Sequence, residues 1–321
     1  MNAPVRIRVG FIVGPTGSGK TALALEVAQA LGAEIVNADS RLFYCAMDIG
    51  TAKPTDDERR RVPHHLIDIR NPDEPLDVAA FGATARERIA EIAGRGNPVL
   101  VVGGSGLYLR VLRGGIFAGP PASPEIRARL AAIAAEHGVP HLHESLRAVD
   151  AVAANRIHVN DLYRITRALE VYELSGEPIS RHQERHAFAQ SDFDELTLAI
   201  ETARELLYEN IDRRFDAMVA AGLVDEVRAL LSAGYSFDRQ PLNSIGYAEI
   251  AAYLRGELTL KAAIENAKRE SRRLAKRQLT WFRHQPGVVW LDPLRAPGKA
   301  REMLAAFFAG RAAPQAALPA S

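Results

Sequence analysis

The chain has 321 residues, of which 47% are hydrophobic and 25% are charged, and its net charge is +1. This is the composition of an ordinary globular protein, long enough for one large domain with an insertion or for two domains. It excludes a polycation, so nucleic-acid binding would need local basic patches. The single cysteine, Cys45, excludes an internal disulfide and a cysteine-based zinc cluster.

The cysteine usage also fits a reducing cytoplasm. No run of the sequence approaches the roughly 18 apolar residues of a membrane span. We therefore expect a cytoplasmic protein without a membrane partner, and we expect it to be a monomer.

The first third of the chain alternates short apolar runs with segments of helical spacing. Residues 5–13 predict a buried strand rather than a signal peptide, because the apolar run is short and leads directly into Pro15, glycines and Lys20. Next come a predicted helix at 21–31, a strand at 33–36, a helix at 78–93 and a strand at 98–102. This alternation predicts an α/β fold, a parallel sheet flanked by helices.

The pattern changes between residues 114 and 195. Glycine and proline interrupt the chain at 114–121, and the predicted elements that follow are all helices, at 124–137, 141–147, 160–175 and 178–186. We interpret 114–195 as an all-helical insertion in a core formed by 1–113 and 196–321. The core resumes with a strand at 197–200, helices over 204–233, 246–255 and 259–284, and an apolar run at 288–291. The Ala/Pro-rich tail from Ala309 is expected to be disordered.

A phosphate-binding loop follows the first predicted strand. The eight residues match the pattern of glycine, four residues, then Gly-Lys-Thr, and they are Gly14, Pro15, Thr16, Gly17, Ser18, Gly19, Lys20 and Thr21. The glycines let backbone amides wrap an anion, the helix presents its positive end, and the lysine adds a charge. The hydroxyl of Thr21 is placed to bind Mg²⁺. The core is thus predicted to be P-loop NTPase-like, although the loop does not distinguish ATP or GTP from another pyrophosphate.

Two more polar segments follow predicted strands, Asp39-Ser40 and Gly103–Gly106. Because the carboxyl ends of parallel strands meet at one edge of a sheet, we expect both to converge on the loop. Asp39 is a candidate to accept a proton from a nucleophile or to hold Mg²⁺ through water, and a turn or capping role is the alternative. A second acidic motif is absent, since Val99–Val102 is followed by glycine, which disfavours a motor ATPase.

Basic residues concentrate late in the chain. Residues 261–283 hold eight Lys and Arg against two Glu, interleaved with Trp281 and Phe282. The insertion adds Arg156, Arg164 and Arg167. Such a pattern can follow an RNA backbone and stack on bases, and a solvated helix face is the alternative. The adjacent His64 and His65 point different ways, which disfavours a metal site.

Several separate motifs resemble the tRNA dimethylallyltransferases, also called tRNA isopentenyltransferases. They run in order along nearly the whole chain: Gly14–Thr21, Asn37–Arg41, Met47–Pro54, Pro63–Asp68, Val102–Tyr108, Arg156–Asp161, Arg167–Tyr172, Arg214-Phe215, Gly222–Val227, Ser244–Tyr247 and Ala275–Arg283. The strings Asp-Ile-Gly-Thr-Ala-Lys-Pro and Lys-Arg-Gln-Leu-Thr-Trp-Phe-Arg are the specific ones, since a phosphate-binding loop alone is common.

The resemblance implies transfer of a dimethylallyl group from dimethylallyl diphosphate to N6 of an adenosine in tRNA. The acceptor would be the adenosine beside the anticodon, position 37, in tRNAs reading codons that begin with U. Lys20, Arg214 and Mg²⁺ at Thr21 would stabilise the departing pyrophosphate, and Asp39 would take the amine proton. Ser105 stands where the family usually has threonine and would orient the amine or a phosphate oxygen.

The resemblance also implies a surface for the tRNA anticodon stem-loop. Its expected members are Asp39, Ser40, Arg41, Leu42, Ser105, Arg127, Arg164, Arg167, Arg272, Arg273 and Arg277, with the insertion as the clasping arm. Three positions depart from the family pattern: Leu42 replaces a common glutamine, Val159 a proline, and Asn210 a commonly basic residue. We expect these departures to shift tRNA affinity or choice more than they affect the chemistry.

Three other functions share the phosphate-binding loop. A related adenylate isopentenyltransferase would prenylate free AMP or ATP, but a mononucleotide needs no extended basic surface. A small-molecule kinase would use ATP as the donor. A non-enzymatic RNA-binding or regulatory protein would not need Asp39 and Ser105 beside the loop.

Overall fold

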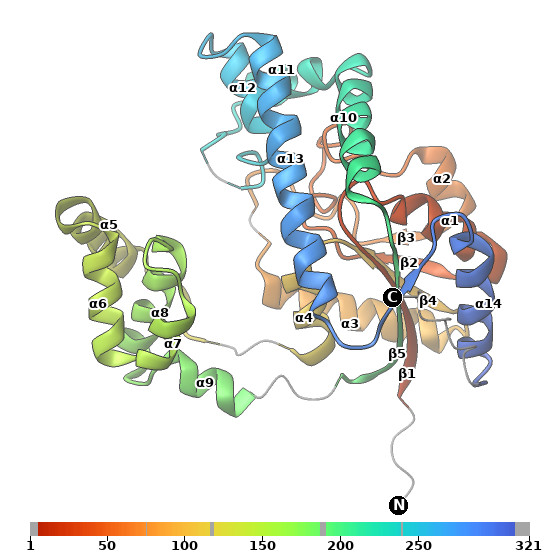
Figure 1. Ribbon diagram of the computed structural model, residues 1–321, viewed down its shortest axis with the longest axis horizontal. Coiled ribbons are helices and arrows are strands. Elements are labelled where there is room, and N and C mark those ends of the chain that lie inside the picture. Colours follow the sequence, from red (N-terminus) through yellow and green to blue (C-terminus); the bar gives the residue numbers. More distant parts are fainter. Residues whose placement is uncertain (1–5, 75, 116–118, 187–190, 239, 312–321) are drawn as a thin grey trace, which may run out of the picture. The chain divides into compact units, whose positions relative to one another are not determined.

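The computed structural model of the chain describes residues 6–74, 76–115, 119–186, 191–238 and 240–311 (Figure 1). The chain divides into two compact units, one formed by 1–113 with 191–321 and the other by 114–190. The core therefore resumes at 191 rather than at 196, because strand β5 spans Phe193–Ile200 and its first residue already pairs with Ile7 of β1.

A six-stranded sheet in the order β3-β2-β4-β1-β5-β6 forms the centre of the core. Every neighbouring pair is parallel, as predicted. Beside β5, the strands are β1 Ile7–Val13, β2 Glu34–Asn37, β3 His64–His65, β4 Val99–Gly103 and β6 Val288–Leu291. Strand β1 is apolar and buried from Val9 to Val13 because it pairs on both edges and is covered on both faces there.

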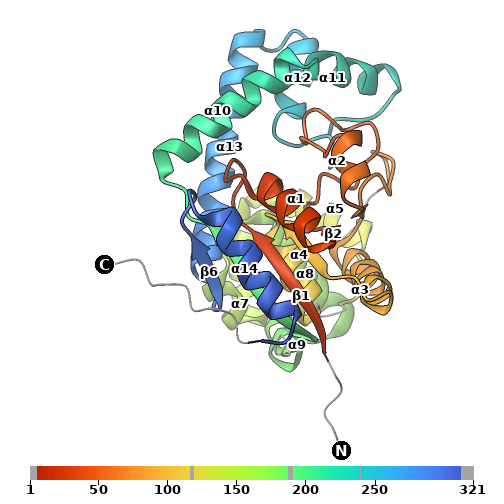
Figure 2. The ribbon, with the colours of Figure 1, turned by 90° about the vertical axis from the view of Figure 1, so that its right-hand side faces the viewer.

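Helices cover the two faces of this sheet. Helices α1 Lys20–Leu31 and α14 Ala296–Phe308 pack on one face (Figure 2). A Cβ on Gly10 would lie 2.5 Å from the Leu304 side chain, so glycine in β1 allows this close approach of α14. The other face is covered by α3 Val78–Gly94 and α4 Gly106–Gly114.

Four more core helices follow the fifth strand: α10 Arg204–Ala220, α11 Leu223–Ser232, α12 Tyr247–Leu254 and α13 Leu260–Arg283 (Figure 1). The prediction of continuous helix over 204–233 is wrong, because Gly222 adopts φ 105° and separates α10 from α11. Helix α13 packs against both α10 and α12, and its residue Gln278 contacts the phosphate-binding loop.

The insertion contains five described helices: α5 Pro124–His137, α6 Val139–Val149, α7 Ala151–Arg156, α8 Leu162–Ser175 and α9 Ile179–His186. It has its own apolar core, with Leu130, Leu146 and Ile165 among the buried residues. The short helix α7 was not predicted. It begins where the Asp150 side chain accepts a hydrogen bond from Ala153 N at 2.8 Å.

Four elements of the core were also not predicted. Helix α2, Asp56–Arg61, has no apolar face and starts with a capping box between Thr55 and Glu58. Strand β3 has only two residues, and α4 and α14 carry glycine or proline in their first turn.

Most of the tail from Ala309 lies outside the described residues. None of the helices that the structure describes is both long enough and apolar enough to span a membrane.

Candidate active site

The phosphate-binding loop joins β1 to α1, as predicted. Gly17 has φ 82°, and a Cβ there would lie 2.8 Å from the Ile211 side chain, so this position needs glycine on both counts. Gly19, the residue before α1, provides no side-chain cap. The first amides of α1 are therefore available to an anion at the positive end of the helix dipole.

Lys20, near the end of this loop, is buried. Its Nζ atom donates to the carbonyl of Pro15 at 3.4 Å. Burial lowers the pKa of Lys20 to about 8, with Asp39 opposing the shift and Arg214 adding to it. A bound anion would favour the charged form, so this lysine is suited to binding phosphate.

Asp39 is oriented by its neighbours at the end of β2. The Asn37 side chain accepts a hydrogen bond from Asp39 N at 2.8 Å and donates to Leu66 O at 3.0 Å. Asp39 Oδ1 accepts from Arg41 N at 3.0 Å. Its Oδ2 atom has no hydrogen bond to any part of the chain that the structure describes. One carboxylate oxygen is thus fixed, and the other can accept a proton.

Ser105 lies next to this turn. Its Oγ accepts a hydrogen bond from Ser40 N at 3.4 Å, so the strand end carrying Asp39 and the glycine-rich turn after β4 are in contact. The structure therefore brings together the three strand ends that the sequence placed at one edge of the sheet.

Arg214, on α10, joins the same group. Its Nη1 donates to Thr16 Oγ1 at 3.2 Å and its Nη2 donates to Thr51 O at 3.3 Å. Burial lowers the pKa of Arg214, and the charge of Asp39 opposes that shift. The guanidinium stays charged at neutral pH and lies between the phosphate-binding loop and the segment carrying Thr51.

Gln278 of α13 connects two of these loops. Its Oε1 accepts from Thr16 N at 2.9 Å, and its Nε2 donates to Gly104 O at 2.9 Å. A Cβ on Gly104 would lie 2.7 Å from Gln278 Nε2 and 2.9 Å from Gly14 O. Glycine at 104 thus allows the two loops and this side chain to meet.

Two cavities meet at this group of residues. The larger has a volume of about 520 Å³ and the smaller about 60 Å³. Both are lined by Thr16, Asp39, Thr51 and Arg214. The larger also contacts Ser40, Arg41, Ser105, Tyr108, Tyr247, Arg277 and Gln278, and the smaller contacts Lys20, Thr21, Leu42 and His64.

Two arginines, Arg41 and Arg277, line the larger cavity. Within the described ranges, neither the Arg41 nor the Arg277 guanidinium makes a hydrogen bond or ion pair. Burial lowers the pKa of Arg41, with Asp39 opposing. Both groups are positioned to contact an anionic or hydrogen-bonding ligand in this cavity.

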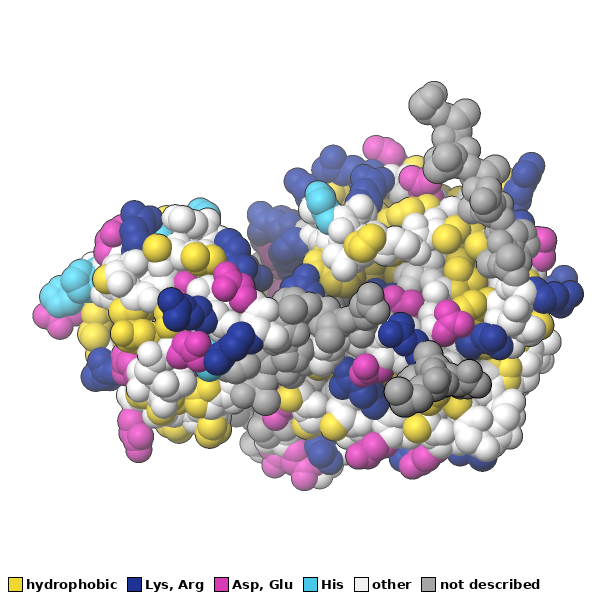
Figure 3. All heavy atoms as spheres, turned by 90° about the horizontal axis from the view of Figure 1, so that it is seen from below, with side chains coloured by type: hydrophobic (Ala, Val, Ile, Leu, Met, Phe, Trp, Pro, Cys, Tyr) yellow, Lys and Arg dark blue, Asp and Glu magenta, His cyan; other side chains and the backbone are white. Residues whose placement is uncertain are grey.

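The other arginines expected to bind RNA already form ion pairs within the chain. Arg272 contacts Asp212 at 2.5 Å, and Arg273 contacts Glu270 at 2.6 Å. In the insertion, Arg127 and Arg167 both bind the buried Glu170, and Arg164 lies 3.3 Å from Asp161. On the face shown in Figure 3, both basic and acidic side chains are exposed. RNA binding by these five arginines stays a prediction.

The smaller cavity also offers a donor set that fits Mg²⁺. It is lined by Thr21 and Asp39, whose hydroxyl and carboxylate are hard oxygen ligands, and substrate phosphates usually complete such a site. Among the described residues, no group of three or more His, Cys, Asp and Glu side chains is arranged for a metal ion. The two histidines, His64 and His65, bind Val62 O and Glu34 instead.

Sequence reasoning gave no role to Gln278, Thr51 or Tyr247. Each stands in a string that was matched to the family as a whole: Gln278 in Ala275–Arg283, Thr51 in Met47–Pro54 and Tyr247 in Ser244–Tyr247. The signal was therefore present, but the contacts are long-range. Gln278 and Thr16, for example, are 262 positions apart.

Family models and known proteins match most of the chain. The family model for IPP transferase matches residues 42–285, and that for isopentenyl transferase matches residues 7–75. A tRNA dimethylallyltransferase of Syntrophobacter fumaroxidans is 51% identical over 90% of this chain and 84% of its own length. One of Geobacter metallireducens is 49% identical, over 93% of this chain and 96% of its own.

Solved structures show the same similarity. The full-length tRNA isopentenylpyrophosphate transferase of Bacillus halodurans is 38% identical with a TM-score of 0.70, covering 94% of this chain and 97% of its own. A eukaryotic dimethylallyltransferase acting on tRNA is 26% identical with a TM-score of 0.82, covering 96% of this chain and 81% of its own. The chain therefore belongs to the IPP transferase family.

Proposed function

We propose that this enzyme transfers a dimethylallyl group from dimethylallyl diphosphate to N6 of an adenosine next to the anticodon of tRNA. The observation that carries the proposal is the pair of cavities that share Asp39 and Arg214. One cavity is lined by Lys20 and Thr21 of the phosphate-binding loop. The other is large enough for a nucleoside and is lined by two arginines, Arg41 and Arg277, that form no ion pair with any described residue.

The donor binds through its diphosphate. The amides at the start of α1 bind phosphate oxygens, and Lys20 and Arg214 add two charges at the place where negative charge develops as the carbon–oxygen bond breaks. Thr21, with Asp39 nearby, would hold Mg²⁺, which supplies further neutralisation of the leaving pyrophosphate. The loop thus holds the leaving group of an alkyl transfer.

The acceptor amine is a weak nucleophile, because its lone pair is delocalised into the adenine ring. As the bond between N6 and the terminal allylic carbon forms, pyrophosphate leaves and N6 loses one proton. Asp39 is positioned to take that proton through Oδ2, since Oδ1 accepts from Arg41 N and Oδ2 has no hydrogen bond within the described part of the chain. Ser105 lines the same cavity and is placed to orient the amine.

RNA must present an unstacked adenosine to this cavity. Arg41 and Arg277 would contact the extruded nucleotide or its phosphates, since both line the cavity and neither has a partner among the residues that the structure describes. The anticodon stem-loop would contact α13 and the insertion through Arg272, Arg273, Arg127, Arg164 and Arg167. We propose that the enzyme acts as a cytoplasmic monomer.

The decisive assay supplies labelled dimethylallyl diphosphate with either an anticodon stem-loop carrying adenosine or AMP. We expect label in the RNA, and none when that adenosine is replaced by guanosine. Label in AMP alone would instead identify an adenylate isopentenyltransferase. Transfer of the γ-phosphate of ATP, without prenyl transfer, would identify a kinase.

Substitution of Asp39 tests its role in the chemical step. We expect Asp39→Ala to lower kcat roughly 10²–10⁴-fold, the usual contribution of a general base, while RNA affinity changes little. Asp39→Asn keeps the hydrogen bond from Arg41 N but cannot take the proton, so it should be equally slow. If either variant lost RNA binding to a similar degree, Asp39 would be a positioning residue instead.

A further inference from the structure

Glu226 binds a turn at the edge of the larger cavity. Its Oε2 accepts hydrogen bonds from Asp48 N at 2.9 Å and Ile49 N at 2.8 Å, and its Oε1 accepts from Gly50 N at 3.1 Å. Three successive amides therefore converge on one carboxylate. Such a concave run of amides is a typical anion-binding arrangement, here satisfied by a side chain of α11.

Tyr247 completes this arrangement from α12. Its hydroxyl donates to Glu226 Oε1 at 2.5 Å. Burial raises the pKa of Tyr247, and the charge of Glu226 raises it further, so the hydroxyl stays protonated and remains a donor. A Cβ on Gly50 would lie 2.5 Å from the Tyr247 ring. The turn, the tyrosine and the carboxylate are thus in direct contact.

The turn bound by Glu226 belongs to a segment, residues 48–53, whose last residue, Lys53, also fixes it to the core. The Nζ of this buried lysine donates to Tyr44 O at 2.9 Å and to Asp68 Oδ1 at 2.5 Å. Ala46 and Ala52 have φ 59° and 51°, a region that residues with a Cβ rarely adopt. Backbone strain of this kind persists where surrounding contacts fix the chain, and it is frequent at functional sites.

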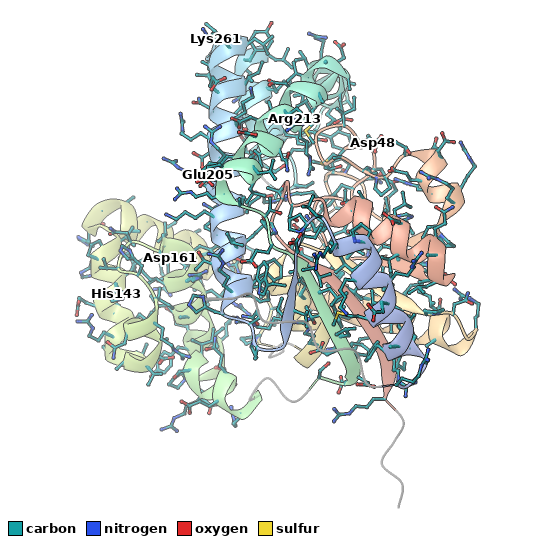
Figure 4. The ribbon with its side chains drawn as sticks, turned by 45° about the vertical axis from the view of Figure 1, so that its right-hand side comes forward. Asp48, His143, Asp161, Glu205, Arg213 and Lys261 are labelled. Atoms are coloured by element: carbon teal, nitrogen blue, oxygen red, sulfur yellow. The ribbon has the colours of Figure 1, made fainter. Side chains whose placement is uncertain are left out.

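Thr51, the next residue along, connects this segment to the reaction. Its carbonyl accepts the hydrogen bond from Arg214 Nη2, and Thr51 lines both cavities. Figure 4 labels Asp48, the first residue of the segment 48–53, and Arg213 on α10, the residue before Arg214. Glu226 itself is not among the residues that line either cavity, so it acts through the segment that it binds.

We infer that Glu226 is a positioning residue, which fixes the Thr51 carbonyl and through it orients the Arg214 guanidinium for the diphosphate. The inference rests on the proposed function only for the identity of the donor, since any diphosphate ligand of the loop would depend on the same contact. Inorganic pyrophosphate is therefore a suitable probe, because its binding needs neither RNA nor prenyl transfer.

The test is a double-mutant cycle read by pyrophosphate binding in calorimetry. We expect Glu226→Ala to weaken binding about tenfold in the wild-type background. In the Arg214→Ala background the same change should weaken it less than about twofold, because the residue through which it acts is already absent. Full tenfold weakening in both backgrounds would overturn the inference.

Glu226→Gln covers the case in which the alanine variant folds poorly. Glutamine keeps the shape of the side chain, but its NH₂ group would meet hydrogen-bond donors where a carboxylate oxygen of Glu226 now accepts. We therefore expect a loss of pyrophosphate affinity smaller than that of Glu226→Ala, with the same dependence on Arg214. Glu249→Gln is the matched control. Glu249 accepts a hydrogen bond from Gly246 N at 2.7 Å at the start of α12 and does not contact the segment. We expect it to bind pyrophosphate within about twofold of the wild type, and a tenfold loss there would also contradict the inference.

Discussion

Lys20 and Arg214 place two cations against one carboxylate, Asp39, around the smaller cavity. Burial disfavours the charge on both, and a single carboxylate only partly offsets it. A diphosphate would add negative charge between these two cations. We therefore expect both cations to contribute to the affinity of the site for an anion.

This charge balance predicts how donor binding depends on pH. The pKa of Lys20 is about 8, against an ordinary value of 10.5, so the lysine is charged below pH 8 and loses its proton as the pH rises through 8. We expect the affinity for dimethylallyl diphosphate to fall between pH 7.5 and pH 9.5, with proton uptake on binding at the upper end. Titration calorimetry in buffers of different ionisation enthalpy measures both.

Lys20→Arg is the control for this pH dependence, because a guanidinium stays charged throughout that range. Its affinity for dimethylallyl diphosphate should be lower overall but nearly independent of pH. An equally steep fall in the arginine variant would show that a group other than Lys20 titrates.

The residues of the site differ in how far the sequence could predict them. Lys20, Asp39 and Ser105 follow strand ends, and parallel topology brings strand ends together, so local patterns were sufficient. Glu226 and Gln278 are on helices distant in the sequence, and apart from the Tyr247 hydroxyl their hydrogen-bond partners are backbone amides and carbonyls. A backbone partner leaves no residue type to recognise, so the sequence alone could not indicate these contacts.

At the scale of elements, α13 was predicted as a basic helix for RNA, but its inner face has a second role. Gln278 contacts both the phosphate-binding loop and Gly104, and Ala275 and Phe282 are buried. The basic residues of this helix could be predicted from the sequence because lysine and arginine are recognisable by type. The break between α10 and α11 was harder to predict, since a glycine such as Gly222 can also stand inside one long helix.

Gln278 gives a prediction at this scale. Because it holds Thr16 N and Gly104 O together, Gln278→Ala should raise the KM for dimethylallyl diphosphate about tenfold, equivalent to about 1.4 kcal/mol, with a smaller change in kcat. Steady-state kinetics with saturating RNA measures the split. Gln285 lies just beyond the end of α13 and donates a 3.4 Å hydrogen bond to Trp281 O. Gln285→Ala removes only this bond and should leave KM within about twofold of the wild-type value. A loss confined to kcat in Gln278→Ala would contradict a role in shaping the loop.

At the scale of the whole molecule, the insertion is one of the two compact units of the chain. Among the described residues, its apolar cluster includes none from the core, and the buried Glu170 pairs with Arg127 and Arg167. Burial raises the pKa of Glu170, but hydrogen bonds from Arg127, Arg167 and Ser123 N outweigh this and leave the pKa below its ordinary value. The carboxylate thus contributes stability above its ordinary pKa, and that stability is lost as the pH falls through the lowered value.

Loss of Glu170 should therefore unfold the insertion selectively. The carboxylate is fully buried and holds α5 to α8 through Arg127, so we expect Glu170→Ala to destabilise the insertion by about 3 kcal/mol. Amide hydrogen exchange should accelerate in α5 and α8 but not in β1, and RNA affinity should fall while dimethylallyl diphosphate still binds. Glu173→Ala, which breaks a more exposed pair with Arg129, should cost less than about 1 kcal/mol. Equal acceleration in β1 would show instead that the two units unfold together, and unchanged RNA affinity would remove the insertion from the RNA-binding surface.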